Sequence, residues 1–218
     1  MTSSKPKPTI VLVHGAWHKP THYAELVSAL RDLGYELHVP ALPSMKGDWP
    51  PTADLETDTR YLHDYVERLA QDGRQIVILL HSYGGQVGTN ALARLCLSVE
   101  TRTQQSLPAS GGAVIHLIYM CALVLLEGRS MMGIFRDNCD EDLVPLFMET
   151  ADVVRRFWNR ESQGRDLSTP VGDQRNMVAN MRAAGKEVQV FELDTGQCPH
   201  VTWLSEVVDV VDGIIRGL

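Results

Sequence analysis

The sequence lacks several features that would point to whole classes of protein. No apolar run approaches the length that spans a bilayer, so we expect no membrane partner. The 218 residues carry a formal net charge of −7, which argues against a nucleic-acid partner. No phosphate-binding glycine loop and no cluster of metal ligands is recognisable, so we expect neither a cofactor nor a metal ion.

Paired cysteines are also missing. The four cysteines have no Cys-x-x-Cys spacing, and the eight histidines are scattered. We interpret the thiols as buried or incidental groups in a reducing compartment. Residues 1–8 are polar and have no hydrophobic core, so they do not resemble a signal peptide. The four cysteines are Cys96, Cys121, Cys139 and Cys198. From the thiols and the polar start of the chain we expect a cytoplasmic protein.

Apolar runs and amphipathic segments alternate along the chain. This order predicts an α/β fold, with a mostly parallel sheet of about six strands and helices on both faces. A chain of 218 residues is long enough for one core, so we expect a single domain over 1–218. The strand at 113–120 is almost continuously apolar, as a central parallel strand should be. The expected strands are 9–13, 35–39, 75–80, 113–120 and 187–193, and the expected helices are 21–33, 54–71, 84–97, 171–184 and 202–216.

The most informative motif directly follows the apolar run 75–80. The chain there reads Leu80-His81-Ser82-Tyr83-Gly84-Gly85. A serine between a β-branched strand and a glycine-rich helix start is typical of a nucleophile elbow, whose turn strains the serine backbone and exposes its Oγ. Gly84 is needed because the helix must pass close to the strand. We predict strained backbone angles at Ser82; the alternative is a chance Ser-x-Gly-Gly in an ordinary loop.

A second motif follows the strand at 9–13, where residues 14–18 read His-Gly-Ala-Trp-His. A tetrahedral intermediate carries a negative oxygen that needs two preorganised N–H donors. The elbow offers the N–H of Tyr83, and the loop after the first strand offers that of Ala16. The order and separation of the two motifs favour one shared site over the alternative that Gly15 simply ends a strand.

Together these residues resemble the small α/β hydrolases, a family that includes plant methyl-ester hydrolases, hydroxynitrile lyases and many fungal hydrolases. The resemblance rests on residues 11–18, 33–35 and 81–85, and it is greatest to fungal members. It extends over 8–126 and 164–218 and is weak between them. Leu80 stands where the family's G-x-S-x-G pattern has its first glycine. The resemblance implies an α/β-hydrolase fold and an esterase-like or lactonase-like serine enzyme.

The resemblance also indicates where the acid and the base should lie. The family's acid occupies a run like Asp-x-x-x-Pro, which Asp166 to Pro170 matches; alternatively, Asp166 only starts the next helix. The family's base is the histidine of Gly-His-x-Pro, and this chain has Gln197 at that position. An amide is neither a base nor an acid near neutral pH, so the ordinary Ser-His-Asp relay cannot operate in this sequence. His200 is a candidate substitute.

Residues 124–163 should hold a lid, and they are fewer than relatives usually have there. A shortened lid suggests an open, apolar pocket. Six residues are candidates for lining this pocket; the alternative is that they only pack the lid against the rest of the domain. They are Trp17, His18, Met131, Phe135, Phe157 and Trp158.

Three functions remain open. The first is hydrolysis of a small apolar ester or lactone through Ser82, with the base lost by engineering or naturally. The second is a non-hydrolytic isomerase, lyase or cyclase on the same scaffold, of the kind used in secondary metabolism. The third is a protein that binds a small molecule without turnover. The sequence indicates neither the substrate nor the oligomeric state.

Overall fold

A four-stranded parallel sheet forms the centre of the molecule. The computed structural model describes residues 6–48, 52–93, 95, 112–130, 133 and 171–218. Within them the strand order is β2-β1-β3-β4, and all three pairings are parallel. The bounds are Thr9–Val13 for β1, Leu37–His38 for β2, Gln75–His81 for β3 and Ala113–Met120 for β4. The α/β architecture with a parallel sheet, predicted from the sequence, is confirmed.

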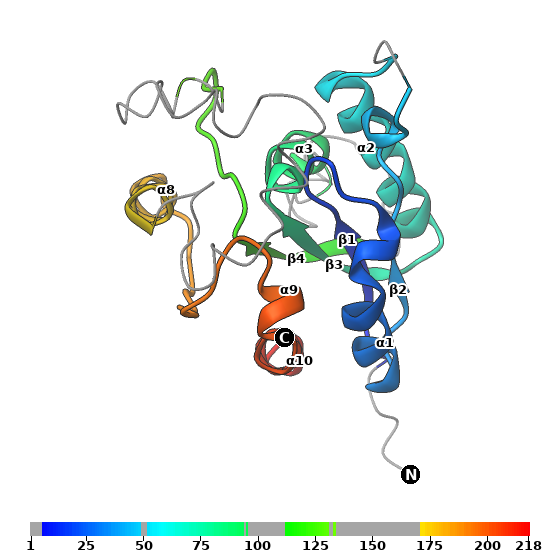
Figure 1. Ribbon diagram of the computed structural model, residues 1–218. Helices are drawn as coiled ribbons and strands as arrows, with labels where there is room; N and C mark the ends of the chain where they lie inside the picture. The colour runs from blue at the N-terminus through cyan, green and yellow to red at the C-terminus, as the bar shows by residue number, and fades with distance from the viewer. Residues whose placement is uncertain (1–5, 49–51, 94, 96–111, 131–132, 134–170) are drawn as a thin grey trace.

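Alternate residues of the two inner strands build two separate cores. Val11 and Ile78 point into one core, beneath the helices α2 (Leu55–Gln71) and α3 (Tyr83–Leu92). Ile10 and Leu79 point into the other, against α1 (Ala24–Asp32) and α10 (Leu204–Arg216). Figure 1 shows the sheet between these two helix layers. A strand buried on both faces needs a continuous apolar run, which is what 9–13 and 75–80 supply.

The helices begin and end largely where their capping residues predict. The Asp54 side chain accepts a hydrogen bond from the Thr57 N–H and so caps α2. Gly34 and Gly73 follow α1 and α2 with φ of +85° and +81°, a conformation that glycine adopts without strain. The segment predicted as one helix over 21–33 begins as the 3-10 helix η1 (Pro20–Tyr23). The remaining elements are η2 (Pro43–Met45), α8 (Val171–Ala183) and α9 (Pro199–Thr202).

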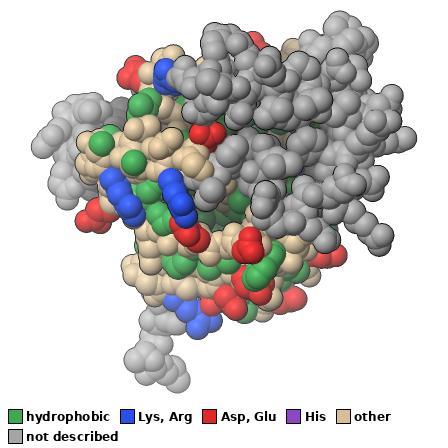
Figure 2. All heavy atoms as spheres, turned by 60° about the vertical axis from the view of Figure 1, so that its left-hand side comes forward, with side chains coloured by type: hydrophobic (Ala, Val, Ile, Leu, Met, Phe, Trp, Pro, Cys, Tyr) green, Lys and Arg blue, Asp and Glu red, His purple; other side chains and the backbone are tan. Residues whose placement is uncertain are grey.

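One prediction about a strand was wrong. Residues 187–193 form no strand; Val190 and Phe191 are 45% and 47% exposed. The alternating pattern of this segment is not enough, because a strand also needs a neighbour to pair with. Strand β4 lies at one end of the four described strands, and Ile115 on it is 38% exposed, so its predicted central position in a larger sheet stays a prediction. Figure 2, which brings this side forward, shows hydrophobic side chains at the surface among acidic ones.

Several expectations fall on residues that the structure does not describe. They include most of the predicted lid over 124–163 and the end of the helix predicted over 84–97. No helix in the described part of the chain has both the length and the hydropathy of a bilayer span.

Candidate active site

Ser82 lies at the turn between β3 and α3. Its backbone has φ +51° and ψ −121°, a combination that a residue with a side chain rarely adopts. Such a conformation costs on the order of 1–3 kcal/mol and persists only where the surroundings enforce it. The carbonyl of Ser82 accepts hydrogen bonds from the N–H groups of Gly85 and Leu123, 2.9 and 3.1 Å away. The predicted strained turn at Ser82 is confirmed.

Two glycines allow this turn to form. A Cβ on Gly84 would lie 2.3 Å from the carbonyl oxygen of Val13 on β1. A Cβ on Gly85 would lie 2.4 Å from the carbonyl oxygen of Leu123, which follows β4. Helix α3 therefore lies directly against the ends of two strands, and no side chain fits between them. Tyr83 is the first residue of α3, so its N–H lies before the first hydrogen-bonded turn of the helix.

The loop after β1 lies next to this turn. A Cβ on Gly15 would lie 3.1 Å from the Ser82 Cβ and 3.2 Å from the His18 Nδ1. His14 anchors the loop, because its Nε2 accepts from the Leu42 N–H and its Nδ1 donates to the Gly15 carbonyl. Burial lowers the pKa of His14, which keeps the ring neutral and both bonds intact. Trp17 has φ +58° and is 58% exposed at the tip of the loop.

A buried carboxylate, which the sequence analysis did not single out, supports the elbow from the other side. Asp58 on α2 is fully buried and accepts the hydroxyl of Tyr83 at 3.0 Å. It also accepts the backbone N–H of Ser44 at 2.9 Å and the hydroxyl of the same residue. Asp58 thereby ties the first residue of α3 to Ser44 on η2. Its position in the sequence could have indicated that it is buried, because Asp58 lies four residues before Leu62 on the buried face of α2.

A chain of hydrogen bonds connects the loop after β1 to the loop that carries Gln197. The Gly15 N–H donates to the Tyr23 hydroxyl at 3.1 Å, and that hydroxyl lies 2.6 Å from His81 Nδ1. The Nε2 of His81 lies 2.8 Å from the Gln197 carbonyl, which can only accept. Nε2 therefore carries the proton, and Tyr23 donates to Nδ1. Both nitrogens of His81 are used, and burial, followed by the neighbouring His200, holds its pKa well below the ordinary value.

Gln197 is held at both its backbone and its side chain. Besides the contact with His81, its Nε2 donates to the Cys121 carbonyl at 3.1 Å. Its Oε1 is buried and has no hydrogen-bond partner in the structure. Cys121 itself has φ +44°. The residues that directly follow β3 and β4, Ser82 and Cys121, therefore both have a strained backbone. Position 197 is thus an ordered amide that no change of protonation near neutral pH can turn into a base.

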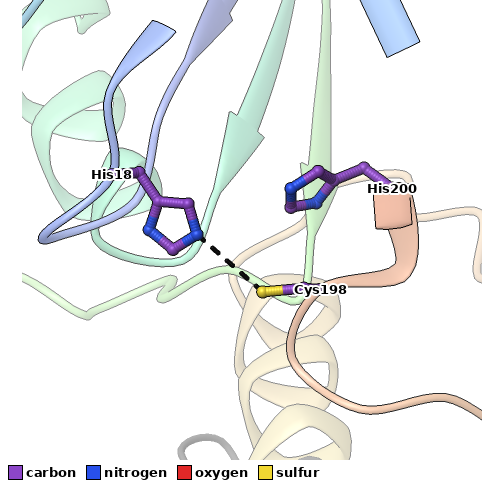
Figure 3. Close-up of side chains that lie close together, drawn as sticks. All are labelled: His18, Cys198 and His200. Atoms are coloured by element: carbon purple, nitrogen blue, oxygen red, sulfur yellow. Dashed lines mark hydrogen bonds between the residues drawn. The ribbon is translucent and has the colours of Figure 1, made fainter. Parts of the chain in front are cut away.

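Three further side chains lie close together beside the loop that carries Gln197 (Figure 3). His18 comes from the loop after β1, Cys198 precedes α9 and His200 lies on α9. The Cys198 Sγ lies 3.8 Å from the His18 Nε2, and His200 stacks on Tyr23 with ring centroids 4.4 Å apart. Burial lowers the pKa of His18 to about 4 and, together with His18, that of His200 to about 3.

The structure therefore brings together part of the predicted site. Ser82, Tyr83, Ala16 and His18 lie around the elbow, and the loop with Gln197 reaches it through His81. The proposed acid and most pocket residues lie outside the described residues. These are Asp166, Met131, Phe135, Phe157 and Trp158.

This fold and this turn identify the class of protein. Residues 10–210 match the Alpha/beta hydrolase family, and the chain belongs to it.

Relatives with assigned names support the same class. The chain is 34% identical to "Alpha/beta hydrolase nvfD" of Aspergillus novofumigatus over 147 residues, which are 67% of this chain and 55% of that protein. It is 28% identical to a "Carbendazim hydrolyzing esterase" of a Nocardioides species over 84% of this chain and 71% of that one. A pyrethroid hydrolase from Sphingobium faniae shares the fold, with a TM-score of 0.63, 18% identity and coverage of 96% and 97%. The names place hydrolases and an esterase among the relatives of this chain.

Proposed function

We propose that this chain is a serine-type enzyme that acts on a small, largely apolar ester or lactone. The observation that carries the proposal is the backbone of Ser82, strained at φ +51° between β3 and the first turn of α3. That conformation has a cost, and exposing a nucleophilic oxygen above the sheet is a reason to keep it. The hydrolase and esterase names of relatives support the reaction class.

In the proposed reaction, the Ser82 Oγ attacks the carbonyl carbon of the substrate. The negative charge that develops on the carbonyl oxygen is met by the N–H groups of Tyr83 and Ala16. The N-terminus of α3 adds the positive end of its helix dipole at the same point. Asp58 acts as a positioning residue here, because it holds the side chain of Tyr83 and not the substrate.

The proton of Ser82 has no efficient acceptor in this proposal. Gln197 occupies the base position, and the carboxylate proposed to orient the base is that of Asp166. His200 is a poor substitute, since a pKa of about 3 leaves its ring a very weak base. Removing a triad base costs on the order of 10⁴–10⁶ in kcat, so we expect slow acyl transfer by the chain as it stands.

Restoring the base tests the proposal. We expect Gln197→His to raise the rate of p-nitrophenyl butyrate hydrolysis by about 10³-fold or more, measured with EDTA present. Gln197→His combined with Ser82→Ala is the matched control and should lose the gain. An unchanged rate in folded Gln197→His, or a gain that survives Ser82→Ala, would contradict the proposal.

A non-hydrolytic reaction is the second candidate. Gln197 favours it, because the amide is ordered by the Cys121 carbonyl and is not merely a missing histidine. There the N–H groups of Ala16 and Tyr83 would polarise a carbonyl, with Ser82 and Gln197 as hydrogen-bond donors. Conversion of a candidate substrate without uptake of water or an acyl adduct would select this reaction, and binding without conversion would select a ligand-binding protein.

A further inference from the structure

His18, Cys198 and His200 form a compact set of nitrogen and sulfur donors. Each offers one ligand atom, and these atoms all lie within 4.8 Å of one another. His18 is separated from the other two by almost the whole chain, so the fold alone brings the group together. Figure 3 shows the two imidazoles facing the space that holds the Cys198 sulfur.

The separations suit a tetrahedral metal centre. With Zn–S of about 2.3 Å and Zn–N of about 2.0–2.1 Å, a nitrogen and a sulfur on one zinc ion lie about 3.6 Å apart. The His18 Nε2 and the Cys198 Sγ are 3.8 Å apart. An upper limit of 4.8 Å for all three atoms means that small rotations of the side chains complete the geometry.

The tautomer of His18 leaves the correct nitrogen available for a metal. Its Nδ1 lies 2.8 Å from the Ala16 carbonyl, which only accepts, so Nδ1 carries the proton. The lone pair is then on Nε2, the atom that lies towards Cys198. Metal-binding histidines usually donate their other N–H to a carbonyl or carboxylate in this way, which fixes the ring.

His200 gives an independent indication that a ligand is needed. It is 2% exposed, and neither of its ring nitrogens has a hydrogen-bond partner in the structure. A buried polar group without a partner costs about 1–3 kcal/mol, and such groups are rare in folded proteins. A metal ion beside His18 and Cys198 would satisfy one of these nitrogens.

We propose that His18, Cys198 and His200 bind one zinc ion. Two imidazoles and a thiolate are donors that zinc prefers, whereas magnesium and calcium prefer oxygen. Binding forms one Zn–S and two Zn–N bonds, and the thiol of Cys198 releases one proton to solvent. The fourth position is left for water or for a group of a bound small molecule. The site does not depend on the proposed reaction at Ser82.

Cobalt titration of the full, metal-free, reduced chain tests the site. We expect one equivalent of Co²⁺ to bind, with a thiolate-to-cobalt charge-transfer band, and one equivalent of Zn²⁺ to displace it. Cys198→Ser should abolish the band, whereas Cys121→Ser, the matched thiol control, should retain it. His200→Gln should weaken binding more than about 100-fold, because it removes a direct ligand and not only a supporting contact. His63→Gln on α2 is the matched imidazole control and should bind normally.

Two measurements on the unaltered chain avoid any question of misfolded variants. Zinc at about 100 times its Kd should raise the Tm by roughly 5–10 °C, and the same concentration of Mg²⁺ should not. Zinc should also slow alkylation of Cys198, but not of Cys121, in peptide maps. Absence of stoichiometric binding, a band that survives Cys198→Ser, or equal alkylation of Cys198 with and without zinc would overturn the proposal. None of these readouts requires catalysis, so they separate the failure of this site from that of the proposed function.

Discussion

The region around the elbow and the loop at 194–200 differ in the chemical groups that they offer to the proposed site. Around Ser82, the strained turn, the close approach of Gly84 to Val13 and the buried Asp58 all maintain one geometry. The loop at 194–200 is held by the contacts of Gln197 with His81 and Cys121, and we propose that this amide stands where the family has its base. In the proposed function, the groups that would polarise a carbonyl are therefore present, and the group that would move a proton is replaced.

The largest expected effect on the hydrolysis rate comes from changing the proposed acid, Asp166. In the Gln197→His background, Asp166→Asn should remove most of the gain in hydrolysis rate, a loss of about 10³-fold, because the imidazole then adopts the wrong tautomer. The measurement is the rate of p-nitrophenyl butyrate hydrolysis, with Asp173→Asn on α8 as a nearby control. If both variants hydrolyse equally fast, the acid lies elsewhere, with the acidic residues of 137–142 the next candidates.

The packing of the elbow predicts a large loss of stability. Gly84→Ala places a methyl group 2.3 Å from the Val13 carbonyl oxygen and should lower the free energy of unfolding by about 3 kcal/mol. Gly213→Ala on α10 meets nothing within 4 Å and should raise it by about 0.5–1 kcal/mol. Urea unfolding of both variants checks the contrast, and equal stabilities would mean that α3 does not lie against β1 in this way.

The burial of His200 predicts a smaller effect, a dependence of the free energy of unfolding on pH. The pKa of His200 is about 3 when folded, against an ordinary value of 6.5, so the unfolded chain binds the extra proton first. Stability is then complete above about pH 6.5 and falls as the pH drops towards the folded pKa. Between about pH 7 and about pH 5 this one group removes about 2 kcal/mol.

His200→Gln isolates that contribution. With EDTA present, the variant should lose about 2 kcal/mol less stability than the unaltered chain over the same pH interval. The neighbours that share the site, His18, His81, Tyr23 and Cys198, are unchanged in both proteins. Parallel stability curves would show that His200 is not held neutral by its surroundings.

The sequence predicted those features that local patterns determine. Runs of β-branched residues placed β1 and β3, and the glycines after Ser82 placed the strained turn, because strand propensity and close approach act over a few residues. Residues 187–193 have an alternating pattern as well, but pairing depends on a neighbouring strand that no local pattern specifies.

Contacts between distant residues were the main omission. His18 and Cys198 meet only because the loop after β1 and the loop before α9 lie at the same edge of the sheet, so the scattered histidines gave no indication of a metal site. Asp58 was detectable in principle, as an acidic residue on the apolar stripe of a helix. Its partners Ser44 and Tyr83 were not, since they come from different segments.

The most direct test of the account is to find which atom of this chain becomes acylated. The unaltered chain is incubated with p-nitrophenyl butyrate in the presence of EDTA, and the adduct is located by peptide mass spectrometry. Because Gln197 cannot activate water, the acyl group should accumulate on the peptide that contains Ser82 and should be absent from Ser82→Ala. No adduct on the folded chain, or an adduct on Cys198 that persists in Ser82→Ala, would contradict the assignment of Ser82 as the nucleophile.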